Sequence, residues 1–254
     1  MSIGAIYPSL QERTVLITGG ATGIGACLVE NFVAQGAHVG FVDLDVGAGQ
    51  ALAARLSQAV RPPFFVQADI TDTTAMSRAL DAIRLQFGRI TILINNAAND
   101  ARHSLEQTTP ESWDAGVATN LKHQFFCAQA VVSDMQTAGG GSIINMGSIS
   151  WMLKMAGLPV YTICKSAIQG LTKSLARELG PYNIRVNTLV AGAVLTDKQL
   201  KLWLDEERIA EIRRSQCLTR SIYPADIANM ALFLAADDSA MCTAQDFIVD
   251  GGWT

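Results

Sequence analysis

The chain alternates short runs of β-branched and apolar residues with longer windows of helical periodicity, and this alternation limits the possible folds most strongly. It predicts strands at 14–18, 39–42, 64–66, 92–94, 142–146, 184–190 and 247–249. Helices are predicted at 23–35, 48–59, 74–87, 110–135, 160–179, 198–216 and 225–235. Strands that alternate with helices of this length form βαβ units. We therefore expect one α/β domain over residues 1–254, with a doubly wound, seven-stranded parallel sheet and helices on both faces.

Composition narrows the class of protein. Of the 254 residues, 49% are hydrophobic and 17% are charged, so the chain can bury a substantial core. A net charge of −4 argues against nucleic-acid binding through phosphate neutralisation. No segment reads as a membrane span or a signal peptide. The five cysteines lack a C-x-x-C pair, which disfavours a disulfide framework or a zinc site. We expect a cytoplasmic protein with no metal and no nucleic-acid or membrane partner.

A glycine-rich turn follows the first predicted strand and opens the first predicted helix. It reads T-G-G-A-T-G-I-G over Thr18 to Gly25, a wider spacing than G-x-G-x-x-G. Such glycines let a pyrophosphate approach the backbone at a helix N-terminus. The alternative is a tight strand–helix connection without a ligand.

Two acidic residues support the cofactor interpretation. Asp43 ends the second predicted strand, where a carboxylate accepts hydrogen bonds from the adenosine ribose hydroxyls and repels a 2′-phosphate. NAD is therefore favoured, with NADP as the alternative, unless Asp43 only caps a loop. Asp69 follows the third strand and is a candidate for the adenine edge or, equally, for a helix cap.

A second motif combines a phenol with a cation. Tyr161 and Lys165 lie four positions apart and share one helix face. A neighbouring cation favours the phenolate and lowers its pKa, which suits general acid–base chemistry. Ser148, after the fifth strand, could hold the same substrate oxygen. Asn120, within the long fourth helix, could disturb that helix and hold a water beside the lysine, or be an ordinary buried amide.

These motifs, with Asn95-Asn96-Ala97-Ala98 after the fourth strand, together resemble the short-chain dehydrogenase/reductase family from about Leu10 to the end of the chain. The resemblance implies a Rossmann-type fold, a homotetramer, and direct hydride transfer with no metal. It also implies a catalytic tetrad in which Tyr161 is the general base, Ser148 orients the substrate oxygen, Lys165 binds the nicotinamide ribose and lowers the tyrosine pKa, and Asn120 holds the water of a proton relay.

The turn after the sixth strand departs from this family. Ala191-Gly192 stands where the family usually has Pro-Gly, which we expect to loosen the turn while keeping close backbone approach. The motifs and the family resemblance together imply a set of cofactor contacts, which are Gly19, Thr22, Gly23, Ile24, Gly25, Asp43, Asp69, Ile70, Asn96, Ala97, Tyr161, Lys165, Gly192, Val194 and Thr196.

Longer polar segments resemble a narrower group, the bacterial aldose 1-dehydrogenases, which oxidise the anomeric carbon of a free sugar to a lactone. They are residues 95–103, 123–129 and 147–151, with the ending 249–253. A sugar needs several hydrogen-bonding groups and an aromatic face. Alternatively, Asn99 only stabilises its loop, Trp151 packs in a subunit contact and Trp203 packs within a lid. The candidate sugar contacts are Asn99, Ser148, Ser150, Trp151, Gln199 and Trp203.

Residues 196–218 carry many charges and several apolar side chains, and we expect them to form a lid over the substrate. The function predicted is therefore NAD-dependent oxidation of an aldose at C1. One alternative is another substrate of the same family, such as a polyol, a hydroxy acid or a 3-oxoacyl thioester. Another is a protein without catalytic activity that senses NAD(H), which the four tetrad residues argue against.

Overall fold

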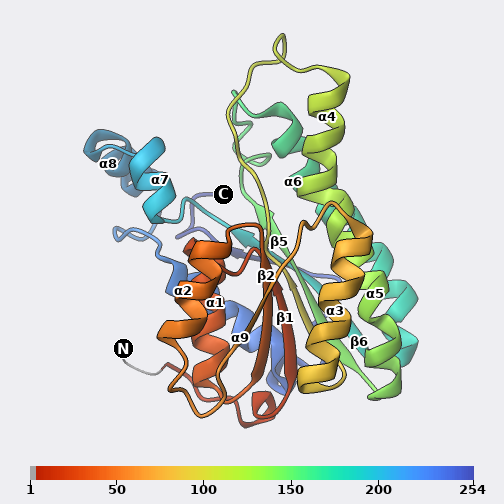
Figure 1. Ribbon diagram of the computed structural model, residues 1–254. Coiled ribbons are helices and arrows are strands. Elements are labelled where there is room, and N and C mark those ends of the chain that lie inside the picture. Colours follow the sequence, from red (N-terminus) through yellow and green to blue (C-terminus); the bar gives the residue numbers. More distant parts are fainter. Residues whose placement is uncertain (1–3) are drawn as a thin grey trace.

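The computed structural model describes residues 4–254, and its centre is a parallel sheet of seven strands in the order β3-β2-β1-β4-β5-β6-β7 (Figure 1). This confirms the predicted doubly wound sheet. A helix follows each strand from the first to the sixth, and the strand order reverses between β1 and β4, where such sheets bind their ligands. The strands are β1 (Thr14–Thr18), β2 (His38–Asp43), β3 (Phe64–Gln67), β4 (Ile92–Asn95), β5 (Gly141–Ser148), β6 (Ile184–Ala191) and β7 (Asp246–Val249).

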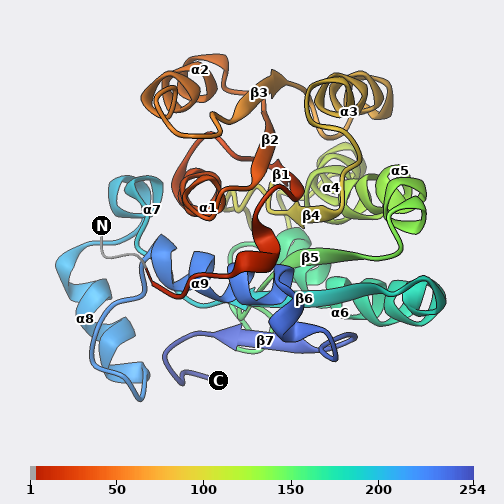
Figure 2. The same ribbon diagram turned by 90° about the horizontal axis from the view of Figure 1, so that it is seen from below.

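Helices cover both faces of the sheet, as Figure 2 shows along the strands. Helices α1 and α9 lie on one face, where a core that includes Phe32 and Phe41 is fully buried. Helices α3, α5 and α6 lie on the other, over a second core that includes Leu80 and Ile143. The helices are α1 (Gly23–Ala34), α2 (Val46–Arg55), α3 (Thr73–Phe87), α4 (Pro110–Val117), α5 (His123–Thr137), α6 (Pro159–Leu179), α7 (Asp197–Leu202), α8 (Glu206–Ser215) and α9 (Pro224–Ala235).

Three predicted helices differ from the structure by more than one residue at an end. The helix predicted at 48–59 is α2, Val46–Arg55, because the Asp45 side chain caps it earlier by accepting from the Ala48 amide at 2.9 Å. Beyond its end, Arg61 bonds to Glu12 and His38 and draws the chain back to the sheet.

The helix predicted at 198–216 is two helices, α7 and α8. The Trp203 and Leu204 amides both donate to the Gln199 carbonyl, which ends α7. Asp205 then caps α8 by accepting from the Arg208 amide at 2.8 Å. The prediction of one continuous helix is therefore wrong, because the capping aspartate starts a new one.

The long helix predicted at 110–135 is also divided. Between α4 and α5, residues Ala118–Lys122 form a π-helical segment that contains Asn120. The predicted disturbance of the helix at this amide is thus present, and π segments are frequent at functional sites.

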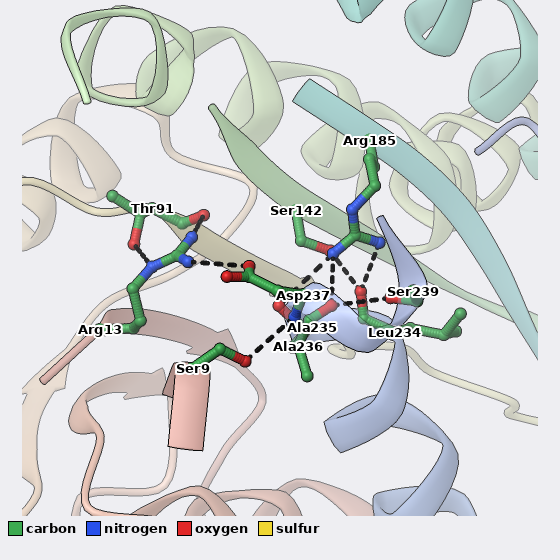
Figure 3. A network of polar contacts seen from close by, with 10 residues as sticks. All are labelled: Ser9, Arg13, Thr91, Ser142, Arg185, Leu234, Ala235, Ala236, Asp237 and Ser239. Atoms are coloured by element: carbon green, nitrogen blue, oxygen red, sulfur yellow. Dashed lines mark hydrogen bonds and ion pairs between the residues drawn. The ribbon is translucent and has the colours of Figure 1, made fainter. Parts of the chain in front are cut away.

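A polar network closes the amino end of the sheet, opposite the expected ligand site (Figure 3). The Arg185 guanidinium donates to the Leu234 and Ala236 carbonyls at 2.7 and 3.1 Å, so a cation caps the C-terminus of α9. Arg13 bonds to Thr91 at 2.8 Å and lies 3.7 Å from Asp237. The network fixes α9 to the edge of the sheet opposite the site.

Within residues 4–254, no helix combines the length and apolar character that crossing a membrane requires.

Candidate active site

A cavity of about 940 Å³ runs along the carboxyl ends of the strands, from the glycine turn after β1 to the N-terminal half of α6. It is lined by every residue that the sequence suggested for cofactor binding, and by Ser148, Tyr161 and Lys165 of the suggested tetrad. Asn120 does not line it, although its neighbour Thr119 does. The structure therefore brings the separate motifs together around one space.

The glycine turn is crowded in a way that only glycine allows. Gly19 and Gly23 have φ angles of +63° and +55°, which favour glycine. A Cβ on Gly25 would overlap the Gly19 carbonyl oxygen. Asn96 braces the turn from β4, because its Nδ2 donates to the Thr18 and Gly19 carbonyls at 3.0 and 2.9 Å. The turn is thereby held open toward the cavity.

Asp43 ends β2 beside this turn. Its Oδ2 accepts from the Ala21 amide at 3.0 Å and its Oδ1 from the Asp45 amide at 3.1 Å. Each oxygen keeps further acceptor capacity for a ligand. Asp69 lies next to it in the cavity lining and accepts from the amide and hydroxyl of Thr71. Asp69 does not cap α3, because Asp72 does.

Lys165 is 2% exposed, and its Nζ donates to the Met146 carbonyl of β5 at 2.6 Å. Burial lowers the pKa of this lysine to about 8. The same Nζ lies 5.5 Å from the centroid of the Tyr161 ring. The lysine is therefore held on the sheet directly beneath the tyrosine.

The pKa of Tyr161 differs from the expectation. Burial raises it to about 12, while the Ser148 side chain and the Arg102 charge oppose the rise. Lys165, whose ammonium is bonded to the Met146 carbonyl and lies 5.5 Å from the centroid of the tyrosine ring, is not among the groups that shift this pKa. Ionising this tyrosine therefore requires further positive charge in the cavity.

Asn120 is 2% exposed, and the oxygen and the nitrogen of its side-chain amide each make one hydrogen bond to the protein. Its Oδ1 accepts from the Asn99 amide at 2.8 Å, and its Nδ2 donates to the Gly116 carbonyl at 3.0 Å. The amide thus connects the π-helical segment to the loop after β4. This contact places Asn99 at the edge of the cavity.

A buried polar chain behind the site was not predicted. Asn95 Nδ2 donates to Asn145 Oδ1 at 2.9 Å, and Asn145 Nδ2 donates to the Thr172 hydroxyl at 3.0 Å. It ties β4, β5 and α6 together below Tyr161. The sequence signal for this polar chain was an asparagine directly after one predicted apolar strand and another within the next, Asn95 and Asn145. A polar side chain buried in a sheet needs a hydrogen-bond partner, so the two could have been expected to pair.

The residues suggested for sugar binding have different surroundings. Ser150 is buried, lines the cavity and has an unpartnered hydroxyl, whereas Trp151 is half-buried and lies outside the lining. Asn99 is exposed at the cavity edge. Gln199 and Trp203 line the cavity, and each contacts the loop after β4.

That loop contributes two residues that sequence reasoning missed, Asp100 and Arg102. Gln199 Nε2 donates to Asp100 at 2.6 Å, and the Arg102 guanidinium lies 5.3 Å from the centroid of the Trp203 ring. Both new residues line the cavity. Their signal was a pair of opposite charges directly after a strand end, where ligands of parallel sheets bind.

The Ala191-Gly192 turn stays tightly packed without the proline. The Gly192 amide donates to the Val249 carbonyl at 3.0 Å, and a Cβ on Gly192 would lie 2.7 Å from the Asp250 Cα. The turn is therefore packed closely against β7 and the residues that follow it.

The chain is similar in sequence and in structure to known proteins. A family model described as enoyl-(acyl carrier protein) reductase matches residues 19–254. A protein named as a probable galactose dehydrogenase of Rhizobium meliloti is 47% identical, covering 97% of this chain and 96% of that protein. A D-xylose 1-dehydrogenase of Caulobacter vibrioides is 43% identical, covering 98% of each. The structure of a short-chain type dehydrogenase/reductase from Mycobacterium ulcerans superposes with a TM-score of 0.89 at 30% identity, over 96% of this chain and 90% of that one.

Proposed function

We propose a reaction for this chain on the premise that it belongs to the short-chain dehydrogenase/reductase family and is an oxidoreductase that acts on CH–OH groups. The reaction is oxidation of an aldose at C1 to the aldonolactone, with NAD as the hydride acceptor. One observation carries it: the cavity that joins the glycine turn to Tyr161 ends in polar and aromatic side chains, among them Asn99, Ser150 and Trp203. The names of the two similar proteins, a galactose and a xylose dehydrogenase, support the same class of substrate.

The residues present fit a dinucleotide. Because the turn packs so tightly at Gly25, its backbone can lie close to a pyrophosphate at the start of α1. The free acceptor capacity of Asp43 suits the paired hydroxyls of a ribose. The cations of the lining are Arg102, Lys165, Lys198 and Arg208, and all come from the loop after β4 or later in the chain. This distribution favours NAD over NADP, whose 2′-phosphate would meet the Asp43 carboxylate.

Proton transfer is assigned to Tyr161. Its phenolate accepts the proton of the C1 hydroxyl, the electrons of that O–H bond form the carbonyl, and the C1 hydrogen leaves as hydride. A nicotinamide held beside Tyr161 and Lys165 would supply the hydride acceptor, and its positive charge would favour the phenolate. Ser148 is assigned to orient the substrate oxygen, since it lines the same cavity as Tyr161 and its side chain opposes the rise in the tyrosine pKa.

Lys165 and Asn120 support this centre from beneath. Lys165, with a pKa of about 8, is mostly a cation at neutral pH and is assigned to the nicotinamide ribose hydroxyls. Asn120 is assigned to the π-helical turn and the water of the proton relay, since its amide holds the backbone there. The segment 196–218, which includes α7 and α8, is assigned as the lid that excludes water from the reaction.

Initial rates of NADH formation test the proposal. Aldoses, polyols and hydroxy acids are assayed with NAD and with NADP, and Tyr161→Phe is the blank. We expect turnover with one or a few aldoses and NAD, absent in the blank. Turnover confined to polyols or hydroxy acids, or no turnover despite NADH binding, would refute the aldose reaction.

A further inference from the structure

Asp100 is a carboxylate that the proposed reaction does not use. It lies in the loop between β4 and α4, lines the cavity, and its side chain is 17% exposed. Its Oδ1 accepts from Lys198 Nζ at 2.7 Å, and its Oδ2 accepts from Gln199 Nε2 at 2.6 Å. Both donors belong to α7, so two segments far apart in the sequence meet at this carboxylate.

The hydrogen bonds leave Asp100 with capacity to bind a ligand. An ionised carboxylate offers about four acceptor sites, roughly two on each oxygen. The two side chains of α7 occupy one site on each oxygen. The oxygens therefore present acceptors side by side, and they are fixed in orientation before any ligand arrives. Two neighbouring hydroxyl groups of a sugar are donors with the matching spacing.

The charge of Asp100 also affects the ionisable groups at the reacting end of the cavity. Its charge raises the pKa of both Tyr161 and Lys165. Lys198, Gln199 and its own backbone amide outweigh burial and hold the pKa of Asp100 below its ordinary value. The group is thus an anion at neutral pH and a pure acceptor.

The other carboxylates of the lining are placed differently. Asp43 and Asp69 lie at the glycine-turn end and bond to their own backbone segments. Asp197 is exposed at the start of α7. Beside Asp100, Trp203 offers an aromatic face, and Arg102 lies against that ring at 5.3 Å from its centroid. A polyhydroxylated ligand can therefore meet a fixed acceptor pair and an apolar surface at one end of the cavity.

We propose that Asp100 is a specificity residue that accepts hydrogen bonds from two neighbouring substrate hydroxyls remote from C1. The inference rests on the proposed aldose reaction and deepens it. Asp100 selects sugars that carry this hydroxyl pair and rejects alcohols that lack it, because an unfilled acceptor would stay desolvated in the complex. Gln199 and Lys198 each donate to one oxygen of Asp100, and either donor alone keeps the carboxylate in place.

A paired deletion of substrate hydroxyls and of the carboxylate tests this inference. The kcat/KM of the wild-type enzyme is measured with its best aldose and with the deoxy analogues that lack one hydroxyl at a time. The same panel is measured with Asp100→Ala and with the near-isosteric Asp100→Asn. Lys198→Met is the matched control, since it removes the ion pair with α7 but keeps the carboxylate.

We expect one or two deoxy analogues to lose about 10- to 100-fold in kcat/KM with the wild-type enzyme, the loss of a hydrogen bond to a charged group. With Asp100→Ala the same analogues should lose less than about threefold relative to the parent sugar. With Lys198→Met the wild-type dependence on those hydroxyls should persist. NADH binding, followed by fluorescence, identifies variants that have folded, and Asp100→Asn replaces Asp100→Ala if the alanine variant has not.

Two results would overturn the assignment. One is an undiminished penalty for each deoxy analogue in the folded Asp100 variants, which would show that the hydroxyls bind elsewhere. The other is a wild-type enzyme that tolerates the loss of every single hydroxyl. If the wild-type enzyme oxidises no aldose at all, the proposed function fails and the inference fails with it, whereas the first two results leave the aldose reaction standing.

Discussion

The ammonium of Lys165 is bonded to the backbone carbonyl of Met146 at 2.6 Å, and not to the phenol oxygen of Tyr161. Both side chains line the cavity. The strand β5 thus supplies the acceptor that keeps a buried cation in place. The cation in turn faces the tyrosine ring at 5.5 Å. Burying the Lys165 ammonium costs free energy, and buried groups of this kind are expected at functional sites.

Lys165→Met should separate activity from stability. We expect kcat to fall by about 10³-fold, since the group assigned to the nicotinamide ribose beside the proton-transferring tyrosine is lost. The free energy of unfolding should change by only about 1 kcal/mol, because removing a buried charge offsets the lost hydrogen bond. NADH formation and urea denaturation measure the two quantities. A variant that keeps its kcat would contradict the role of the lysine.

His123, the first residue of α5, should make stability depend on pH. It is 2% exposed, neither ring nitrogen has a hydrogen-bond partner, and burial with the Lys165 charge lowers its pKa from 6.5 to about 3. Between these values the unfolded chain binds a proton that the folded chain does not. The free energy of unfolding should therefore fall by about 1.4 kcal/mol per pH unit as the pH drops below 6.5.

The apolar variant His123→Phe identifies this contribution. Denaturation in urea at several pH values between 6.5 and 5 gives the unfolding free energy as a function of pH. The slope of this curve should correspond to about one proton fewer for the variant than for the wild-type protein toward the lower end of the range. Equal slopes for the two proteins would mean that His123 titrates alike in the folded and unfolded states.

Gly25→Ala should damage the cofactor turn. A methyl group there would overlap the Gly19 carbonyl, so we expect a loss of about 1–3 kcal/mol in unfolding free energy and at least tenfold weaker NADH binding. Gly47→Ala, at an exposed position of α2 where the new Cβ would meet only Asp45 Oδ1 at 3.5 Å, is the matched control. It should stabilise the protein by about 0.5–1 kcal/mol. Equal behaviour of the two variants would argue against the crowded turn.

The proposed homotetramer predicts an interface on α4, α5 and α6. Trp113, Phe125, Phe126 and Ile163 on these helices are 37–49% exposed. We expect light scattering to give four times the chain mass of 27.2 kDa, and Phe125→Glu combined with Ile163→Glu to lower it. Leu85→Glu, on α3 and at a side chain 91% exposed, should leave the mass unchanged. A monomeric wild-type protein would refute the proposal.

The seven-stranded parallel sheet and the place of the cavity could be predicted because local patterns determine them. Strands such as β1 are buried throughout, and the turn at Gly19 is marked by closely spaced glycines, two of which have positive φ angles. Helix bounds were predicted less well where a single capping side chain decides them. Asp45 and Asp205 each begin a helix at a position that apolar periodicity alone does not reveal.

The polar contacts of the site could not be predicted, because they join residues that are distant in the sequence. Gln199 was expected to face a sugar, yet its amide is bonded to Asp100. The pKa of Tyr161 followed from burial rather than from the lysine four positions away. Spacing along a helix shows which residues share a face, but the neighbouring strand decides which way a charge points.

The hydrogen bonds of Asp43 bear on attempts to redesign the enzyme for NADP. The carboxylate supports the backbone at Ala21 and at Asp45 in addition to its proposed contact with the ribose. Exchanging it for a neutral or cationic side chain would therefore release two main-chain amides of the cofactor loops together with the unwanted charge. A successful redesign has to supply a new acceptor for the Ala21 amide, and libraries that vary Asp43 jointly with residues 20–22 and 44–46 meet this requirement better than a single exchange.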